Sequence, residues 1–249
     1  MSEFHFSKPP INEVVCGIQF DSSHFDFRIQ DQFYEAIKDA YPNIKENPPL
    51  PIIFDREATP PQPVNRVPLI RHFFISGDNS KLIQLQDGRL LFNWRKIEEK
   101  HVYPKFDAVF SEFMKIWEKL SLIFEGNNIK VTPNQVELTY IDHIVRADFG
   151  EQWALEKIFT FFSKTPVVDD LYFRFGIPAP DLSGHLTITS QSGQRITDHK
   201  DVIILDSTLR GINRNMDISN WFKKAHDCIY AFFMDSITED AKKIWGYSK

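Results

Sequence analysis

The residues best suited to chemistry are Asp198, His199 and Asp201, which fall within one short segment. An imidazole between carboxylates can hold a metal ion or transfer protons, so this cluster is the candidate centre of a hydrolase-type enzyme. The cluster lies between two strand-like segments and close to Gly193, a setting typical of a polar turn. The turn is the favoured interpretation, and the enzyme remains an alternative.

Other neighbouring acidic and basic residues are weaker candidates for a catalytic site. Asp142 and His143 are adjacent in a predicted strand, so their side chains point to opposite faces and cannot readily act as a pair. His226 precedes an aspartate on a predicted helix, and an exposed helix surface accounts for both residues. Glu13 and Glu137 hold roughly matching places in two predicted strands, and they would form a carboxylate pair if those strands adjoin.

The sequence contains none of the short motifs that hold phosphate, dinucleotides, zinc or an activated serine. Its two cysteines, Cys16 and Cys228, are too few for a disulfide framework or a four-cysteine zinc site. The eight histidines lack the spacing of metal ligands. We therefore expect no catalytic residues, no metal and no cofactor, and we favour a protein that is not an enzyme.

The clearest structural signal is the segment 81–95, where Asp87 and Gly88 separate two alternating runs. An Asp-Gly pair suits a two-residue turn that needs positive φ at both positions, so the segment predicts a β-hairpin. Its register pairs Leu85 with Leu90 and directs an apolar set toward the core. The opposite face carries groups that suit water, a ligand or another chain, namely Gln84, Gln86, Asn93 and Arg95.

Three further segments are candidate contact surfaces. A later predicted strand would add hydroxyls and an amide to the same sheet face, namely Thr187, Thr189 and Gln191. Arg210 and Arg214 belong to a compact basic segment that could bind phosphate or an acidic partner, although a turn with hydrated arginines is the better interpretation. The segment 48–68 contains seven prolines and predicts a long loop that either wraps the core or binds a partner.

The remaining periodicities predict an alternation of strands and helices. Strands are expected at 11–20, 69–76, 131–145, 171–177, 185–191 and 202–209, in addition to the hairpin. Helices are expected at 30–41, 153–162 and 238–245. Two long amphipathic helices are expected as well, one with Pro104 in its first turn and ending at Gly126, the other capped by Asp217 or Ser219.

The order strand, helix, three strands, long helix occurs twice. We therefore predict an α+β fold of two pseudo-duplicated β-α-β-β-β-α units, one spanning 1–126 with a proline-rich loop at 42–68 and one spanning 127–249. Their strands would form one or two curved antiparallel sheets, covered on one face by the two long helices, within one compact body. The TATA-binding-protein-like and helix-grip folds share this general plan, which says little about activity.

Composition narrows the class of protein. The chain has 249 residues, of which 42% are hydrophobic and 25% are charged, so it can bury a substantial core. Its formal net charge of −5 disfavours nonspecific binding to nucleic acid, and no basic stripe with interleaved aromatic residues is present. The start lacks the pattern of a signal peptide, and no apolar run reaches the length of a membrane span. We expect a cytoplasmic protein that makes no contact with a membrane.

Several motifs occur together along the chain, namely the segments 9–20, 85–96 with Tyr103-Pro104 after it, and 137–141, and then Ala225-His226 and Ile237-Thr238. Taken together, they resemble the motifs of a sporadically distributed, uncharacterised bacterial family of about this length, which is known by its sequence model. The resemblance spans the chain and implies no established activity and no catalytic residues. A sporadic distribution suggests an accessory cassette related to defence or to a toxin–antitoxin pair.

We predict a non-enzymatic binding protein that engages a protein partner, or its own copy, through the sheet face or the proline-rich loop. It would be an accessory or regulatory component of a prokaryotic defence or toxin–antitoxin type system. The alternative is a domain that senses a small molecule or nucleotide in a pocket between sheet and helices. The second alternative is the hydrolase-type enzyme that uses His199 with Asp198 or Asp201.

Overall fold

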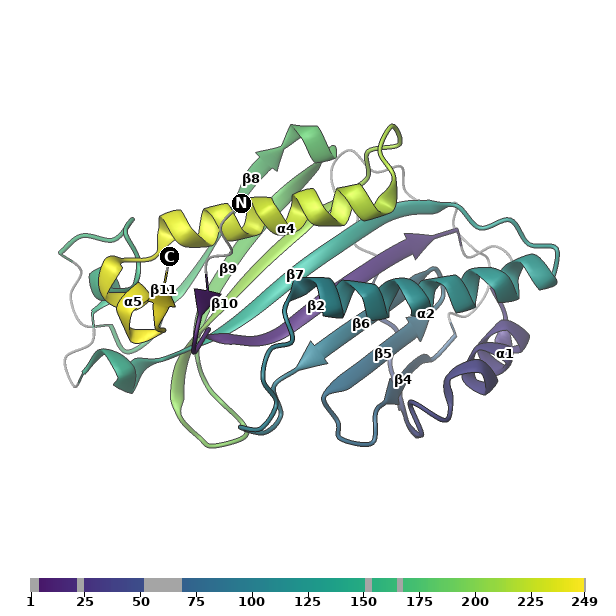
Figure 1. The fold of residues 1–249 in the computed structure, drawn as a ribbon, viewed down its shortest axis with the longest axis horizontal. Coiled ribbons are helices and arrows are strands. Elements are labelled where there is room, and N and C mark those ends of the chain that lie inside the picture. Colours follow the sequence, from purple (N-terminus) through teal and green to yellow (C-terminus); the bar gives the residue numbers. More distant parts are fainter. Residues whose placement is uncertain (1–4, 22–24, 52–68, 151–153, 165–167, 249) are drawn as a thin grey trace.

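The computed structural model describes residues 5–21, 25–51, 69–150, 154–164 and 168–248. Within them, nine strands form one antiparallel sheet in the order β3-β4-β5-β6-β2-β7-β10-β9-β8 (Figure 1). The predicted α+β class with an antiparallel sheet is therefore confirmed. The strands of this sheet are β2 (Ile11–Phe20), β3 (Asn43–Asn47), β4 (Arg71–Ile75), β5 (Lys81–Gln86), β6 (Arg89–Arg95), β7 (Pro133–Val145), β8 (Tyr172–Ala179), β9 (Gly184–Gln194) and β10 (Asp201–Gly211).

Helices connect these strands, and a short strand pair joins the two ends of the described chain. The helices are α1 (Phe27–Ile37), α2 (Phe106–Gly126), α3 (Leu155–Ile158), α4 (Ile218–Ser236) and α5 (Glu239–Ile244), with 3-10 turns at Arg146–Phe149 and Pro180–Leu182. The separate pair consists of β1 (His5–Phe6) and β11 (Tyr247–Ser248). None of the described helices combines the length and the apolar composition that crossing a membrane requires.

The predicted hairpin is confirmed in its turn and in its register. Leu85 lies opposite Leu90, and Ile83 lies opposite Phe92. Gly88 has a φ of 68°, the positive value that a two-residue turn requires and that glycine adopts without strain. The hairpin continues into the centre of the sheet because β6 pairs with β2, and β2 in turn pairs with β7.

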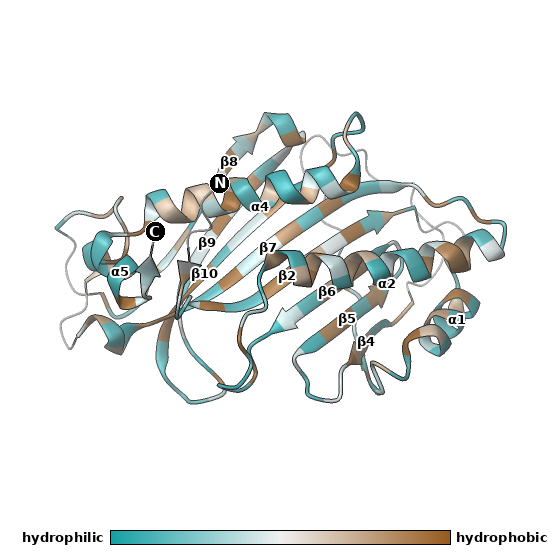
Figure 2. Cartoon of the chain, viewed as in Figure 1, coloured by the Kyte–Doolittle hydropathy of each residue, from teal (hydrophilic) through white to brown (hydrophobic). Residues whose placement is uncertain are grey.

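Each strand has two chemically different sides, because successive residues point to opposite faces of the sheet. Figure 2 shows the resulting alternation of hydrophilic and hydrophobic residues along the central strands. We call one side the apolar face, defined by buried core residues such as Val14, Cys16, Ile18, Phe92 and Leu138. The other side, which carries Gln84, Asn93 and Glu137, is the polar face.

The two long helices contribute aromatic residues to the core. Trp117 on α2 packs against Phe20 on β2, with ring centroids 5.9 Å apart. On α4, the ring of Phe222 lies 5.2 Å from Phe110 and 5.3 Å from Phe113 of α2, so the helices also contact each other. Helix α4 begins as predicted, because the Asp217 side chain accepts a hydrogen bond from the Asn220 N–H at 3.0 Å.

Several predicted boundaries are wrong for local reasons. Helix α1 begins earlier than expected because Asp26 caps it by accepting from the N–H groups of Arg28 and Ile29. Helix α2 begins at Phe106, after Lys105 at a φ of 72°, so Pro104 lies outside its first turn. The predicted helix at 153–162 is reduced to α3, since Phe159 instead forms a β-bridge with Ile237.

Three of the described strands were not predicted at all. Strand β3 has one apolar residue among polar ones and therefore no alternating apolar pattern. With β3, the first half contains one strand more than the predicted order. The pair β1–β11 joins segments too short to carry a periodic signal. Of the proline-rich segment, residues 52–68 lie outside the described part of the chain.

Candidate binding surface

The strand registers place distant residues of the polar face in continuous rows. Asn93 lies opposite Val15, and Val15 lies opposite Thr139. Thr139 then lies opposite Thr208, which lies opposite Thr187. The neighbouring row consists of Leu91, Gly17, Glu137, Arg210 and His185. Residues of the hairpin and residues of β9 therefore share one face of the sheet, as predicted from the sequence.

Glu137 forms an ion cluster at the centre of the polar face. The Nη2 of Arg89 donates to its Oε1 at 2.5 Å, and the Nε of Arg210 donates to its Oε2 at 2.7 Å. The side chains of Glu137 and Arg89 are each 5% exposed, whereas that of Arg210 is 22% exposed. The cluster thus connects a buried region over β6 with a more open region over β10.

Gly17 makes room for this cluster. A Cβ at this position would lie 2.5 Å from Leu91 Cδ2 and 2.6 Å from Glu137 Cγ, closer than real Cβ contacts come. The Glu137 side chain can therefore extend over β2 toward Arg89 only because position 17 has no side chain. Gly17 is therefore needed here for its lack of a side chain and not for an unusual backbone φ.

The charge state of Glu137 follows from its two partners. Burial raises the pKa of this carboxyl, but the nearby charges and hydrogen bonds of Arg89 and Arg210 outweigh burial, and the net pKa is lowered. The carboxylate is therefore ionised at neutral pH and both of its oxygens are engaged. A carboxylate held in this way suits a fixed structural role better than proton transfer.

The hairpin amides are bonded to the protein's own groups. Arg71 donates to Gln84 at 3.1 Å, Gln84 donates to Asn93 at 3.0 Å, and Asn93 donates to Glu13 at 2.5 Å. Gln86 exchanges hydrogen bonds with the backbone of Leu50, each at 2.9 Å. Gln84, Gln86 and Asn93 are all buried, which corrects the expectation that this part of the face is open to a ligand or another chain. We call β5, β6 and β2 the closed part of the polar face.

The other part of the polar face is more accessible. Thr187 and Thr189 on β9 are half-buried, and Arg174 on the neighbouring β8 is exposed. The hydroxyls of Thr208 and Thr139 form a hydrogen bond at 2.7 Å, and the Thr208 hydroxyl donates to Asp206 Oδ1 at 2.6 Å. Burial raises the pKa of Asp206, although Thr208, Arg210 and Arg174 counteract this effect. We call the accessible region over β8, β9 and β10 the open part.

The remaining predicted contact residues lie in three different places. Arg95 shares the polar face and is half-buried, with its Nη2 donating to the Asn79 carbonyl at 2.8 Å. Gln191 is exposed at the end of the open part, opposite Ile204. Arg214 does not belong to the sheet, because it follows β10 in the loop that leads to α4.

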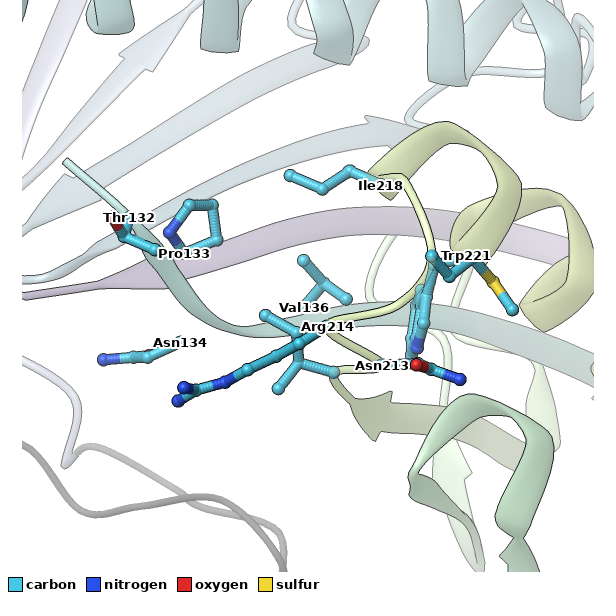
Figure 3. A pocket seen from close by; sticks show the side chains of 10 residues that line it. Thr132, Pro133, Asn134, Val136, Asn213, Arg214, Ile218 and Trp221 are labelled. Atoms are coloured by element: carbon cyan, nitrogen blue, oxygen red, sulfur yellow. The ribbon is translucent and has the colours of Figure 1, made fainter.

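That loop borders a pocket of about 410 Å³ between the start of β7 and the start of α4. Figure 3 shows Val136, Ile218 and Trp221 around it, with the Arg214 side chain extending across it and its guanidinium directed away from Trp221. Trp221 is fixed because its Nε1 donates to the Leu182 carbonyl at 3.0 Å. The pocket is thus mainly apolar, with one exposed cation.

The acid–base candidates from the sequence either bind neighbouring groups of the protein or lie apart from each other. Asp198 is bound by Arg195 at 2.6 Å and approached by Lys200 at 3.4 Å, and His199 has a φ of 57°, as expected for the polar turn. Strands β2 and β7 do adjoin, but Glu137 lies opposite Gly17 rather than Glu13. Four residues of extended strand separate those positions by about 13 Å, so Glu13 and Glu137 form no carboxylate pair.

A second polar cluster lies on the apolar face. The Tyr140 hydroxyl lies 2.9 Å from His226 Nδ1 and 3.2 Å from the Tyr103 hydroxyl, and His226 stacks on Phe106 with centroids 4.3 Å apart. Asp142 follows on the same side of β7, and burial, with a contribution from Asp206, raises its pKa to about 7. Among the described residues, Asp142 Oδ1 has no hydrogen-bond partner.

Sequence reasoning missed this second cluster and the partners of Glu137. The even spacing of Tyr140 and Asp142 in a strand was a signal that both share a face with Leu138. No local signal identifies Arg89 and Arg210 as partners of Glu137, because the three residues come from separate strands. Among the described residues, no group of three or more metal-ligating side chains is present.

Comparisons with known proteins add no relative. A scan of protein-family models finds none that matches the chain, and a search of curated proteins finds no significant match.

Proposed function

We propose that this protein is a non-enzymatic binding protein whose open part of the polar face engages an extended segment of a protein partner. The observation that carries the proposal is the set of hydrogen-bonding side chains that stay accessible beside the fixed Glu137 cluster. They are Arg174, Thr187, Thr189, Asp206 and Arg210. Among the described residues, no group of three or more metal-ligating side chains lies near them.

The chemistry of this surface favours a polar, extended partner. Arg174 lies in the same cross-strand row as Asp206, and Arg210 lies four residues further along β10; both charges counteract the rise that burial causes in the pKa of the Asp206 carboxyl. Side chains on a rigid sheet are already ordered, so they lose little entropy on binding. An extended segment with an acidic side chain near hydroxyl or amide groups would match this alternation of cation, hydroxyl and carboxyl.

A double substitution can test this surface without disturbing the buried network. Thr187→Arg with Thr189→Arg places bulk and charge on half-exposed positions, whereas Gln191→Arg lies at the exposed end of the same strand and is the control. We expect a partner captured from extracts of the source cells by wild type and by Gln191→Arg to be lost with the double variant. The purified partner should then bind wild type by calorimetry. Equal capture by all three folded proteins would contradict the proposal.

A second candidate function rests on the pocket beside α4. Its volume of about 410 Å³ falls within the range of small-molecule sites, and Arg214 supplies a cation at a lining that is mainly apolar. This geometry favours an apolar ligand with one anionic group. Native mass spectrometry of the purified protein should show such a molecule bound, and Arg214→Ala should lose it. Wild type that carries no ligand and gains no thermal stability from apolar carboxylates would argue against this function.

We also infer that the chain consists of two related units, each placing one long helix on the apolar face. The inference rests on strand order: outward from β2 come β6, β5 and β4, and outward from β7 come β10, β9 and β8. Each set is followed in the chain by a long helix, α2 or α4. An experimental structure in which the two sets fail to superpose would count against a duplication.

A role in a prokaryotic defence or toxin–antitoxin type system is part of the proposal and follows only from the family resemblance of the sequence motifs. Co-transcription with a toxin or nuclease gene supports it. A gene that occurs consistently beside housekeeping genes would contradict it.

A further inference from the structure

The two edges of the sheet differ in how they meet solvent. Strand β3 is one edge and carries the adjacent charges of Lys45 and Glu46, which discourage pairing with another strand. Strand β8 is the other edge, and among the described residues it pairs only with β9. Exposed aromatic residues accompany it: Tyr172 is 68% exposed, Phe175 is 37% exposed and Phe161 beside it is 45% exposed. Arg174 and Pro178 are the only protective residues within β8, so this edge is less protected against pairing than β3.

The hydrogen-bonding direction of β8 follows from its pairing. Ser192 donates its backbone N–H to the Leu171 carbonyl at 2.9 Å, so odd-numbered residues of this strand direct their backbone groups toward β9. Even-numbered residues direct theirs outward. Of these, Tyr172, Arg174 and Gly176 present both an N–H and a carbonyl, and Pro178 presents a carbonyl only.

This edge is complementary to a second copy of itself in one antiparallel register, centred on Phe175. Arg174 then lies opposite Gly176 of the other copy, and both exchange backbone hydrogen bonds in each direction. The Tyr172 N–H faces the Pro178 carbonyl and can donate to it, whereas the Tyr172 carbonyl receives no bond in return because proline has no N–H. A register centred on Arg174 would instead place like charges opposite each other, which is unfavourable.

The side chains of β8 also favour the register centred on Phe175. Phe173, Phe175 and Ile177 point to one side of the strand, where the Phe173 and Phe175 rings are 5.9 Å apart. Phe161 adds a ring at 5.8 Å from Phe173 and 6.3 Å from Phe175. In the paired arrangement, Phe175 meets its own counterpart and Phe173 meets Ile177, so these side chains of both copies form one continuous apolar strip, while Tyr172 points to the other face.

We propose that β8 pairs antiparallel with β8 of a second copy, with Phe175 on the two-fold axis, so that the two sheets become continuous. The open part of the polar face would then extend across both copies. The inference goes beyond the proposed function and does not depend on it, because the dimer forms through the strand edge whether or not the face binds a partner.

Sedimentation velocity over a range of protein concentrations tests the dimer. Wild type should shift from monomer to dimer, and Phe175→Glu should weaken the dimer about 100-fold by removing a central aromatic contact and placing two carboxylates together. The matched control is Ile44→Glu, which changes a 43% exposed apolar residue on the opposite edge and should leave the dimer unchanged. Wild type that stays monomeric at all concentrations would overturn the proposal.

A cysteine substitution tests the register independently of dimer strength. Directly opposite residues of a non-hydrogen-bonded pair approach to about 4.5 Å between Cα atoms, within reach of a disulfide. In a Cys228→Ser background, Phe175→Cys should therefore form a disulfide-linked dimer under mild oxidation, whereas Ile177→Cys should not, because it faces Phe173. Equal cross-linking at both positions, or a dimer that persists in folded Phe175→Glu, would overturn the assigned interface.

Discussion

Glu137 and Asp142 are two buried carboxyls on one strand, and their surroundings give them opposite properties. Glu137 lies on the polar face between Arg89 and Arg210, and its pKa is lowered despite burial. Asp142 lies on the apolar face without an arginine partner, and burial raises its pKa to about 7. Burial alone therefore does not decide the charge of a carboxyl; the cations that the fold brings to it do.

Removing the charge of Glu137 should have the largest effect. Glu137→Gln leaves the buried guanidinium of Arg89 without its anion, so we expect the free energy of unfolding to fall by about 3–5 kcal/mol. Chemical denaturation at neutral pH measures this change. Glu239→Gln, which removes a 77% exposed partner of Lys242, is the control and should leave the denaturation midpoint unchanged. A small effect of Glu137→Gln would show that the cluster contributes little to stability.

The opposite pKa shifts should produce opposite pH dependences. The stability from Glu137 is present above its ordinary pKa of about 4.5 and is lost as the pH falls through its lowered folded pKa. Asp142 behaves in the reverse sense: the folded state prefers the protonated carboxyl, so stability declines as the pH rises from about 4 toward about 7.

Asp142→Asn isolates the second of these effects. An uncharged amide removes the penalty of ionisation, so the variant should gain about 3 kcal/mol relative to wild type between pH 5 and pH 8. Thermal unfolding at several pH values would show the two curves diverging between about pH 4 and about pH 7, with no further divergence at higher pH. Parallel curves would mean that Asp142 titrates near its ordinary pKa and that the contrast with Glu137 is smaller than inferred.

Gly17→Ala should disturb the polar face while leaving every charge in place. The new Cβ would lie within 2.6 Å of both Leu91 and Glu137, so those side chains must shift. We expect a loss of about 2 kcal/mol in the free energy of unfolding. Gly77→Ala is a suitable control because a Cβ at Gly77 has no neighbour within 4 Å. Equal stability of the two variants would show that the cluster adapts easily.

The smallest expected effect is a difference in stability between a substitution in the closed part of the polar face and one in the open part. Gln84→Ala removes a buried amide and the hydrogen bonds that it makes with Asn93 Oδ1 and Arg71 Nη1, for a loss of about 1–2 kcal/mol. Thr187→Ala changes a half-buried residue of the open part and should stay within about 0.5 kcal/mol. Equal losses in denaturation experiments would remove the distinction between the two parts.

Local patterns predicted the elements well where one strand or helix carries the whole signal. The Asp87-Gly88 turn set the register of the hairpin, and Asp217 set the start of α4, because each depends on neighbours in the chain. The sharing of one face by Asn93 and Thr187 was also expected, whereas the interpretation of Arg210 as part of a hydrated turn was wrong, because it lies within β10 and binds Glu137. The burial of Gln84 and Asn93 was not predictable, because it depends on partners such as Arg71 and Glu13 from other strands.

The pairing of β2 with β7 affects how the chain folds during its synthesis. Residues 11–20 bond to residues 133–145, so more than a hundred residues of synthesis separate the two partners. Until β7 leaves the ribosome, β2 presents one uncovered row of backbone donors and acceptors next to an apolar surface. Such a late, non-local closure slows folding and exposes the nascent first half to aggregation, which makes chaperone assistance during translation valuable.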